Sequence, residues 1–137
     1  MSEHFADTCY LFALLSKQDQ HHSAAAALED SLSDSDQVHT SEEVLMELLN
    51  FTSKRGEHLR KATVEFVNSL RDRSDVVVYE LDPERFQKAL EKYEKFSDKD
   101  WSLVDCSSIV LIEEFDINGA VFTHDHHFKQ AGFDIAF

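Results

Sequence analysis

Residues 102–125 have the sequence SLVDCSSIVLIEEFDINGAVFTHD, and this stretch decides the class of fold. Residues 106–115 are apolar almost all round the helix that they are expected to form, which places that helix deep in a core. Residues 120–123 form a short apolar run that is typical of a buried strand. A buried helix followed directly by a buried strand predicts an α/β fold, in which helices cover a sheet.

Further helices are predicted where apolar residues repeat at three- and four-residue spacing. Two of them cover about residues 20–32 and 57–72, and a short one is expected near residues 126–131. Two others follow predicted caps, which are Thr40 with Glu43 in a capping box, and Asp82 with Pro83. The helix after Pro83 has an apolar side, formed by Phe86, Leu90 and Tyr93.

Short strands are expected to alternate with these helices. They fall at residues 4–6, 38–39, 76–79, 120–123 and 134–137, of which the first is weak. Alternating strands and helices predict a central, mainly parallel sheet covered on both faces, and 137 residues are enough for a single domain, residues 1–137. In such sheets ligands bind at the carboxyl ends of the strands.

The composition excludes several classes of function. With 13 Lys and Arg against 27 Asp and Glu, the net charge is 13 − 27 = −14, which argues against loose attachment to nucleic acid or anionic membranes. Three glycines cannot form a Gly-rich phosphate loop, and two cysteines exclude a disulfide scaffold and favour a reducing cytoplasm. The apolar run at residues 9–15 is too short for a membrane span and lacks the basic flank of a signal peptide.

One basic segment interrupts the acidic chain. Residues 51–73 carry six Lys or Arg and three acids, a net charge of 6 − 3 = +3. The simpler interpretation is a solvated helix face, and the alternative is contact with a nucleic acid. Under the alternative, the candidate RNA contacts are Lys54, Arg55, Arg60 and Lys61.

Four acids stand out by their position. Asp7 and Asp125 come just after predicted strands, Glu47 lies at the edge of an apolar helix face, and Asp105 opens the buried helix. Carboxylates brought together resist joint ionisation, and a divalent cation removes that conflict. Oxygen ligands without a Cys/His set favour Mg²⁺ or Mn²⁺ over zinc.

Each acid also has a purely structural interpretation. Asp105 can complete a capping box with Ser102, and Asp125 can cap the helix that follows it. Glu47 can be an ordinary solvated residue, and Asp7 can accept backbone N–H groups at a turn. The neighbouring His124, His126 and His127 are interpreted as surface or phosphate-contacting residues, with a general base as the alternative.

Four segments together resemble PIN-domain ribonucleases, and most closely the VapC-type toxins of toxin–antitoxin systems. They are ADTCYL at residues 6–11, TSEEVLMELLN at 40–50, DWSLVDC at 100–106 and THDHHF at 123–128. Each segment is short, but the four occur in the family's order and spacing. The likeness extends from about residue 5 to residue 133, and residues 101–106 and 128–133 are its most specific parts.

The resemblance implies a three-layer α/β/α sandwich with a metal-dependent ribonuclease site. It implies that Asp7, Glu47, Asp105 and Asp125 bind Mg²⁺ or Mn²⁺ and hydrolyse RNA phosphodiester bonds, with Thr8, Ser102 and Thr123 as supporting polar groups. It also implies a cognate antitoxin and a homodimer. Two alternatives are a catalytically weak PIN-like module that acts through protein or RNA binding, and a receiver-type phosphoacceptor domain. The latter fits poorly, because Asp7 has no adjacent acid and Lys129 lies inside a predicted helix.

Overall fold

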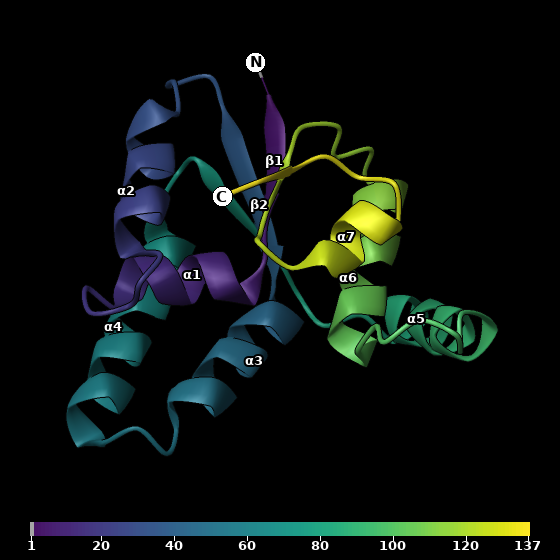
Figure 1. Ribbon diagram of the computed structural model, residues 1–137, viewed down its shortest axis with the longest axis horizontal. Coiled ribbons are helices and arrows are strands. Elements are labelled where there is room, and N and C mark those ends of the chain that lie inside the picture. Colours follow the sequence, from purple (N-terminus) through teal and green to yellow (C-terminus); the bar gives the residue numbers. More distant parts are fainter. Residues whose placement is uncertain (1) are drawn as a thin grey trace.

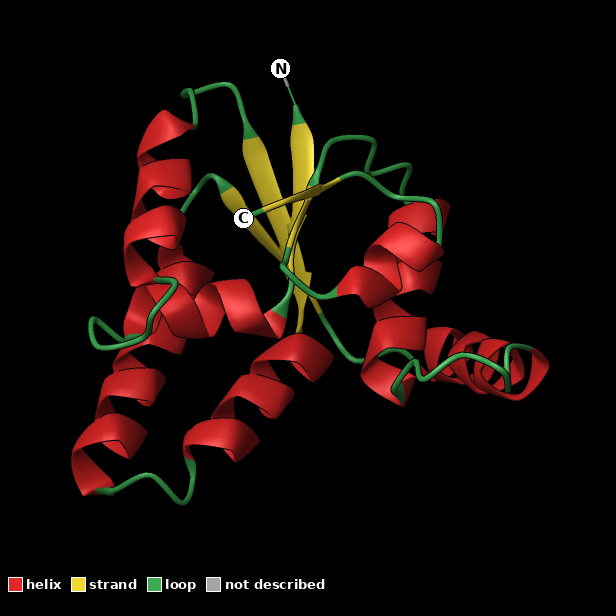
Figure 2. Ribbon diagram, in the orientation of Figure 1, coloured by secondary structure: helices red, strands yellow, loops and turns green. Residues whose placement is uncertain are grey.

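A five-stranded parallel sheet forms the centre of the computed structural model, which describes residues 2–137. The strand order is β3-β2-β1-β4-β5, and every neighbouring pair is parallel. Figure 2 shows the strands side by side between two groups of helices. The strands are β1 (Glu3–Ala6), β2 (Gln37–Ser41), β3 (Val76–Tyr79), β4 (Val121–Phe122) and β5 (Ile135–Ala136).

Helices cover both faces of this sheet, as predicted. Figure 1 shows α1, α2 and α4 on one side of the strands and α5, α6 and α7 on the other. The remaining helix, α3, lies beyond one end of the sheet and packs against α1, α4 and α6. The helices are α1 (Thr8–Leu15), α2 (His22–Ser31), α3 (Glu42–Thr52), α4 (Glu57–Asp72), α5 (Pro83–Lys95), α6 (Leu103–Glu114) and α7 (His126–Gln130).

The core forms around α6, the helix that the sequence placed deepest. Every residue from Asp105 to Ile112 is buried, including the polar Ser107 and Ser108. A helix buried on nearly every side must be apolar nearly all round, which is the pattern that predicted it. No helix among residues 2–137 is both long and apolar enough to cross a membrane.

The weakest predicted strand occupies the middle of the sheet. β1 pairs with β2 on one side and with β4 on the other, and its Phe5 and Ala6 are fully buried. The polar side chains at its start have partners in distant segments. A Glu3 carboxylate oxygen lies 3.1 Å from His39 Nε2, and the Ala120 N–H donates to His4 Nδ1. A polar beginning therefore does not keep β1 at an edge.

Two details of the sequence prediction were wrong. The strand predicted at residues 38–39 continues to Ser41, and Ser41, not Thr40, caps α3 by accepting a hydrogen bond from the Val44 N–H. The Thr40 hydroxyl instead donates to the Ala6 carbonyl across the sheet. The apolar side predicted for α5 is present, and its members Phe86, Leu90 and Tyr93 are exposed, while Arg85 and Ala89 are buried.

Candidate functional site

The four acids singled out from the sequence line one cavity at the carboxyl end of the sheet. Asp7 follows β1 and precedes α1, Asp125 follows β4 and caps α7, and Asp105 lies in the first turn of α6. Glu47 comes from α3, whose first turn faces the same end of the strands (Figure 1). The cavity has a volume of about 730 Å³ and opens to solvent. The adjacent strands β1 and β4 bring Asp7 and Asp125 together across 118 residues of sequence.

Asp7 is the most deeply buried of these acids. Its side chain lies almost wholly out of solvent and accepts a 2.9 Å hydrogen bond from the Thr123 hydroxyl. Burial raises the pKa of Asp7 from 3.8 to about 7, and the charges of Asp105 and Glu47 add to that rise. Hydrogen bonds from the Thr8 backbone and from Thr123 act in the opposite direction and are outweighed. The anionic form of Asp7 therefore has no counter-charge from the protein that compensates its burial.

Asp105 and Asp125 are held by hydrogen bonds and share a histidine. The Asp105 N–H donates to Ser102 Oγ and the Ser102 N–H donates back to Asp105 Oδ2, which confirms the predicted capping box. Asp125 accepts from the His127 N–H and caps α7, also as the structural interpretation expected. His127 Nδ1 lies 3.0 Å from Asp105 Oδ2 and 3.1 Å from Asp125 Oδ1. Both acids therefore act as caps and still present a carboxylate oxygen to the cavity.

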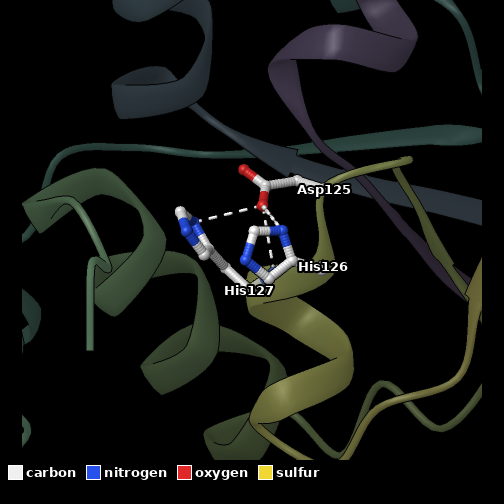
Figure 3. A group of neighbouring side chains, drawn as sticks. All are labelled: Asp125, His126 and His127. Carbon is white, nitrogen blue, oxygen red and sulfur yellow. Dashed lines mark hydrogen bonds and ion pairs between the residues drawn. The ribbon is translucent and has the colours of Figure 1, made fainter. Parts of the chain in front are cut away.

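The histidines beside Asp125 do not all face the same way. Figure 3 shows the rings of His126 and His127 near the Asp125 carboxylate, with His126 Nδ1 3.8 Å from Oδ1. His127 is half-buried between two carboxylates, whereas His126 is exposed. His124 and His126 are exposed, in line with a surface position, and phosphate contact by any of the three histidines stays a prediction. His124 turns to another side of the cavity, where its ring lies 4.4 Å from that of His21.

Glu47 lies in the same cavity but apart from the tightest group of acids. Its carboxylate accepts a short hydrogen bond from the Thr8 hydroxyl at the start of α1. Burial raises the pKa of Glu47, the Thr8 hydrogen bond lowers it, and the charges of Asp105 and Asp125 raise it again, with a net upward shift. Glu47 is thus coupled through its charge to all three of the other acids, since its charge also raises the pKa of Asp7.

Asp7, Asp105 and Asp125 fit a divalent cation. One carboxylate oxygen of each lies within 4.8 Å of the other two. Three hard oxygen ligands at this spacing, one of them buried without compensation, form a donor set suited to Mg²⁺ or Mn²⁺. Asp125 also groups with His126 and His127 at the same spacing, but imidazole nitrogen is a ligand typical of other transition metals, so the three carboxylates are the donor set that fits Mg²⁺ or Mn²⁺.

Comparison with known families agrees with this fold. The family model of the PIN domain matches residues 5–134, nearly the whole chain. The chain belongs to the PIN domain family. No match was found among functionally curated proteins.

Solved structures of other PIN-like proteins are similar over almost their full length. The chain is 25% identical to VapC20 of Mycobacterium tuberculosis, a sarcin-ricin loop cleaving toxin, with 95% of each chain covered and a TM-score of 0.83. FitAcB of Neisseria gonorrhoeae is 17% identical, covers 98% of this chain and 96% of its own, and has a TM-score of 0.64. VapBC2 of Rickettsia felis, bound to a promoter DNA fragment, is 14% identical, covers 96% and 95%, and has a TM-score of 0.62.

The three predicted supporting residues of this PIN domain each contact one or two of the four acids. Thr8 donates to Glu47, and Ser102 shares the capping box of Asp105. Thr123 donates to Asp7 and accepts from the Asp125 N–H, so one hydroxyl joins two of the acids. Cys9 lies beside them, with its sulfur 3.1 Å from Thr123 Oγ1.

The basic segment of this PIN domain lies outside the cavity. Lys54, Arg55, Arg60 and Lys61 are exposed on the α3–α4 connection and the first turn of α4. Arg60 donates to the Ser53 carbonyl, and Lys61 forms an i,i+4 ion pair with Glu57. Arg55 is the member nearest to the cavity lining, because its guanidinium lies 4.0 Å from the ring centre of Phe51.

Proposed function

We propose that this PIN domain is a metal-dependent ribonuclease that hydrolyses RNA phosphodiester bonds and acts as the toxin of a toxin–antitoxin pair. The observation that carries the proposal is the group of Asp7, Asp105 and Asp125, whose carboxylate oxygens lie within 4.8 Å of one another around a buried acid. Membership of the PIN family and the likeness to VapC20 support RNA as the substrate.

Asp7, Asp105 and Asp125 are the residues that would hold Mg²⁺ or Mn²⁺, with Glu47 completing the acidic site. A bound divalent ion in such a site lowers the pKa of water and offsets charge on a phosphate in the transition state. The raised pKa of Asp7 supports this assignment, because a cation would supply the counter-charge that the protein lacks.

The neighbouring side chains fix the direction of each carboxylate. Thr123 orients Asp7, Thr8 orients Glu47, and Ser102 orients Asp105 through the capping box. His127 Nδ1 lies between Asp105 and Asp125 and holds their oxygens at a common position. Groups that orient metal-binding side chains in this way typically contribute 10- to 100-fold in metal affinity or activity.

A cognate antitoxin is the expected protein partner. Similar solved structures include toxin–antitoxin complexes, among them one from Klebsiella pneumoniae. We infer that an antitoxin would occlude the acidic cavity, with a basic side chain among the carboxylates. The remaining parts of the proposal are a single domain over residues 1–137, a homodimer, a cytoplasmic location, and RNA phosphate contacts from Lys54, Arg55, Arg60 and Lys61.

Cleavage of mixed-sequence RNA by the purified protein tests the proposal. Cleavage is expected with Mg²⁺ or Mn²⁺ and is expected to stop when EDTA removes the metal. The substitution Asp7→Asn keeps a group that can accept the Thr123 hydrogen bond but removes the charge, so it should lower the cleavage rate by more than about 100-fold. The matched control Asp34→Asn changes an exposed acid in the turn before β2 and should cleave at the wild-type rate.

The same experiment distinguishes the alternative of a catalytically weak module. A folded wild-type protein that binds RNA but shows no metal-dependent cleavage would support that alternative. Cleavage that survives Asp7→Asn, in a variant with a normal thermal unfolding midpoint, would contradict the assignment of the acidic site.

A further inference from the structure

The acidic cavity lacks the side chains that usually hold nucleic-acid phosphates. No Lys or Arg among residues 2–137 lines it. Six carboxylates line it instead, and a phosphate chain laid along such a wall would be repelled wherever no cation intervenes. They belong to Asp7, Asp19, Glu47, Asp100, Asp105 and Asp125. Away from a bound metal ion, a substrate strand must therefore gain binding energy in the cavity from something other than its phosphates.

Aromatic rings make up much of the rest of the lining, beginning with a pair of histidines. His21, from the α1–α2 connection, and His124, from the β4–α7 connection, have ring centres 4.4 Å apart. Phe137 supports both rings from outside the cavity, at 5.7 Å from His21 and 5.0 Å from His124. Aromatic rings at these separations attract one another, so the contact with Phe137 favours the side-by-side placement of the two histidine rings.

A second aromatic cluster lines the cavity beside α3. Phe12 of α1 and Phe51 of α3 are 4.7 Å apart in an edge-to-face arrangement. Phe51 is 42% exposed, so its ring contributes little to the core although it comes from an otherwise amphipathic helix. The guanidinium carbon of Arg55 lies over the Phe51 ring, 4.0 Å from its centre.

We propose that these two clusters bind unpaired bases of a single-stranded RNA by stacking, on either side of the nucleotide whose phosphate enters the acidic site. The inference rests on the proposed function for the identity of the strand. Histidine and phenylalanine rings are groups on which RNA bases stack. Stacking contributes binding energy without positive charge, which suits a cavity lined by carboxylates.

This mode of binding selects unpaired RNA. Bases inside a duplex already stack on their neighbours and cannot reach a protein ring unless they leave the helix. A duplex would also have to bind through its phosphates, for which the cavity offers no cationic side chain. Because every base has a π-face, the clusters favour loops and single strands over duplexes without reading a particular sequence.

Binding of a 12-nucleotide RNA that contains 2-aminopurine tests the proposal without relying on cleavage. The RNA is titrated with the protein in Ca²⁺ in place of Mg²⁺, its integrity is checked on a gel, and Kd and 2-aminopurine quenching are recorded. The double variant His21→Ala with Phe51→Ala should raise Kd at least about tenfold and lose the quenching. Duplex RNA of the same sequence should bind more weakly and be unaffected by the two substitutions.

Matched variants separate stacking from other effects. His58→Ala and Phe86→Ala change an exposed histidine and an exposed phenylalanine that lie outside the cavity, and together they should leave Kd within about twofold of wild type. The pair His21→Phe with Phe51→Trp keeps flat rings and should retain tight binding and quenching. This ring-preserving pair keeps the test decisive if the alanine variant folds poorly.

The outcomes distinguish this inference from the proposed function. Metal-dependent cleavage by wild type, together with a Kd that the alanine pair leaves unchanged, would overturn the stacking sites and leave the nuclease intact. RNA binding that depends on the two clusters, without cleavage in Mg²⁺ or Mn²⁺, would support the stacking sites and contradict the proposed ribonuclease activity. Failure of wild type to bind the single strand, or equal binding of the duplex, would overturn the stacking proposal.

Discussion

Glu43 and Glu47 lie one turn apart on α3, yet their surroundings shift their pKa values in opposite directions. Glu43 accepts from Arg85 Nε at 2.8 Å and Nη2 at 3.0 Å, and from the Ser107 hydroxyl. Burial acts to raise its pKa, but the hydrogen bonds from Arg85 and Ser107 outweigh burial and hold the pKa below its usual value. Glu47 faces three other acids and its pKa is raised.

The difference separates two uses of a buried carboxylate. The Glu43 region is an ion pair that the fold has completed, and it needs nothing from outside. The acidic cavity holds charges that the fold leaves uncompensated. Uncompensated buried charge destabilises the folded state, and such charge is typical of functional sites and not of structural ion pairs. What marks the site is therefore the absence of a partner for its charge, and not the number of acids in the sequence.

The largest effect is expected from breaking the completed ion pair. Arg85→Ala leaves Glu43 half-buried and unpaired and removes the hydrogen bond from Arg85 to the Glu80 carbonyl, so it should cost about 3–5 kcal/mol of unfolding free energy. Urea unfolding of the wild-type and Arg85→Ala proteins measures this loss of unfolding free energy. The double variant Arg85→Met with Glu43→Leu replaces both charges with apolar groups and should recover most of the loss. A single-variant cost below about 1 kcal/mol would show that the pair is not structural.

In the acidic cavity, the uncompensated charge of Asp7 should make the folded protein less stable as pH rises. Asp7 has a pKa of about 7 in the folded protein against 3.8 as a reference, so the unfolded chain releases this proton first and the folded state loses stability as pH rises through that interval. Between pH 5 and pH 8 in EDTA, wild type should lose roughly 2–3 kcal/mol more than Asp7→Asn.

Chemical unfolding at the two pH values measures that difference, and Asp34→Asn should keep the wild-type slope. Mg²⁺ or Mn²⁺ should reduce the loss in wild type and have little effect in Asp7→Asn, because a cation supplies the missing counter-charge. Parallel pH profiles for wild type and Asp7→Asn would contradict the assignment of an uncompensated charge to Asp7.

The two glutamates themselves provide the most direct comparison of activity. Glu47→Gln should lower RNA cleavage by about 10- to 100-fold with little loss of stability, since it removes a charge that is repelled by Asp105 and Asp125. Glu43→Gln should leave cleavage within about threefold but lower the unfolding free energy, because it weakens the Arg85 pair. An equal loss of cleavage in both variants would mean that the Glu43 region also belongs to the site.

The smallest effect is expected from Arg60 and Lys61 of the basic segment, because both side chains are exposed and lie outside the cavity. Arg60→Ala with Lys61→Ala should weaken RNA binding by no more than about threefold at low salt, with a smaller dependence of affinity on salt. Lys88→Ala with Lys92→Ala, on α5, is the matched control and should change neither quantity. If Arg60 and Lys61 can be removed without any change in affinity or salt dependence, they belong to the structure of α4 alone.

Local sequence patterns correctly predicted the elements whose bounds depend on residues close together in the chain. The helix at residues 57–72 and the strand at residues 76–79 have the bounds that the sequence indicated. The central position of β1 could not be predicted, because Glu3 and His4 find their partners in His39 and Ala120, far along the chain. The choice of Ser41 over Thr40 as the cap of α3 depends on how far β2 extends, which is also set by its neighbours.

The same limit applies to the acidic cavity. Parallel topology brings the ends of β1 and β4 together, so the proximity of Asp7 and Asp125 followed from the fold class. The sequence singled out Glu47 by its place at the edge of an apolar helix face, but it could not show the ion pair of Glu43, because the partner, Arg85, is 42 residues away on another helix. The contact of His127 with Asp105 and Asp125 depends on where α7 begins. In the sequence, only the position of His127 two residues after Asp125 indicated that it lies near the acids.

The central position of β1 also sets the order in which the molecule can be completed during synthesis. Residues 3–6 emerge first but remain unpaired on one side until residues 121–122 are available. A partial chain that lacks β4 therefore cannot form the cavity. Thr123, which donates to Asp7, and Asp125 both directly follow β4. A growing polypeptide of this sequence would carry no assembled acidic site until nearly all of it has left the ribosome, and the slow closure expected of such distant pairing delays the site further.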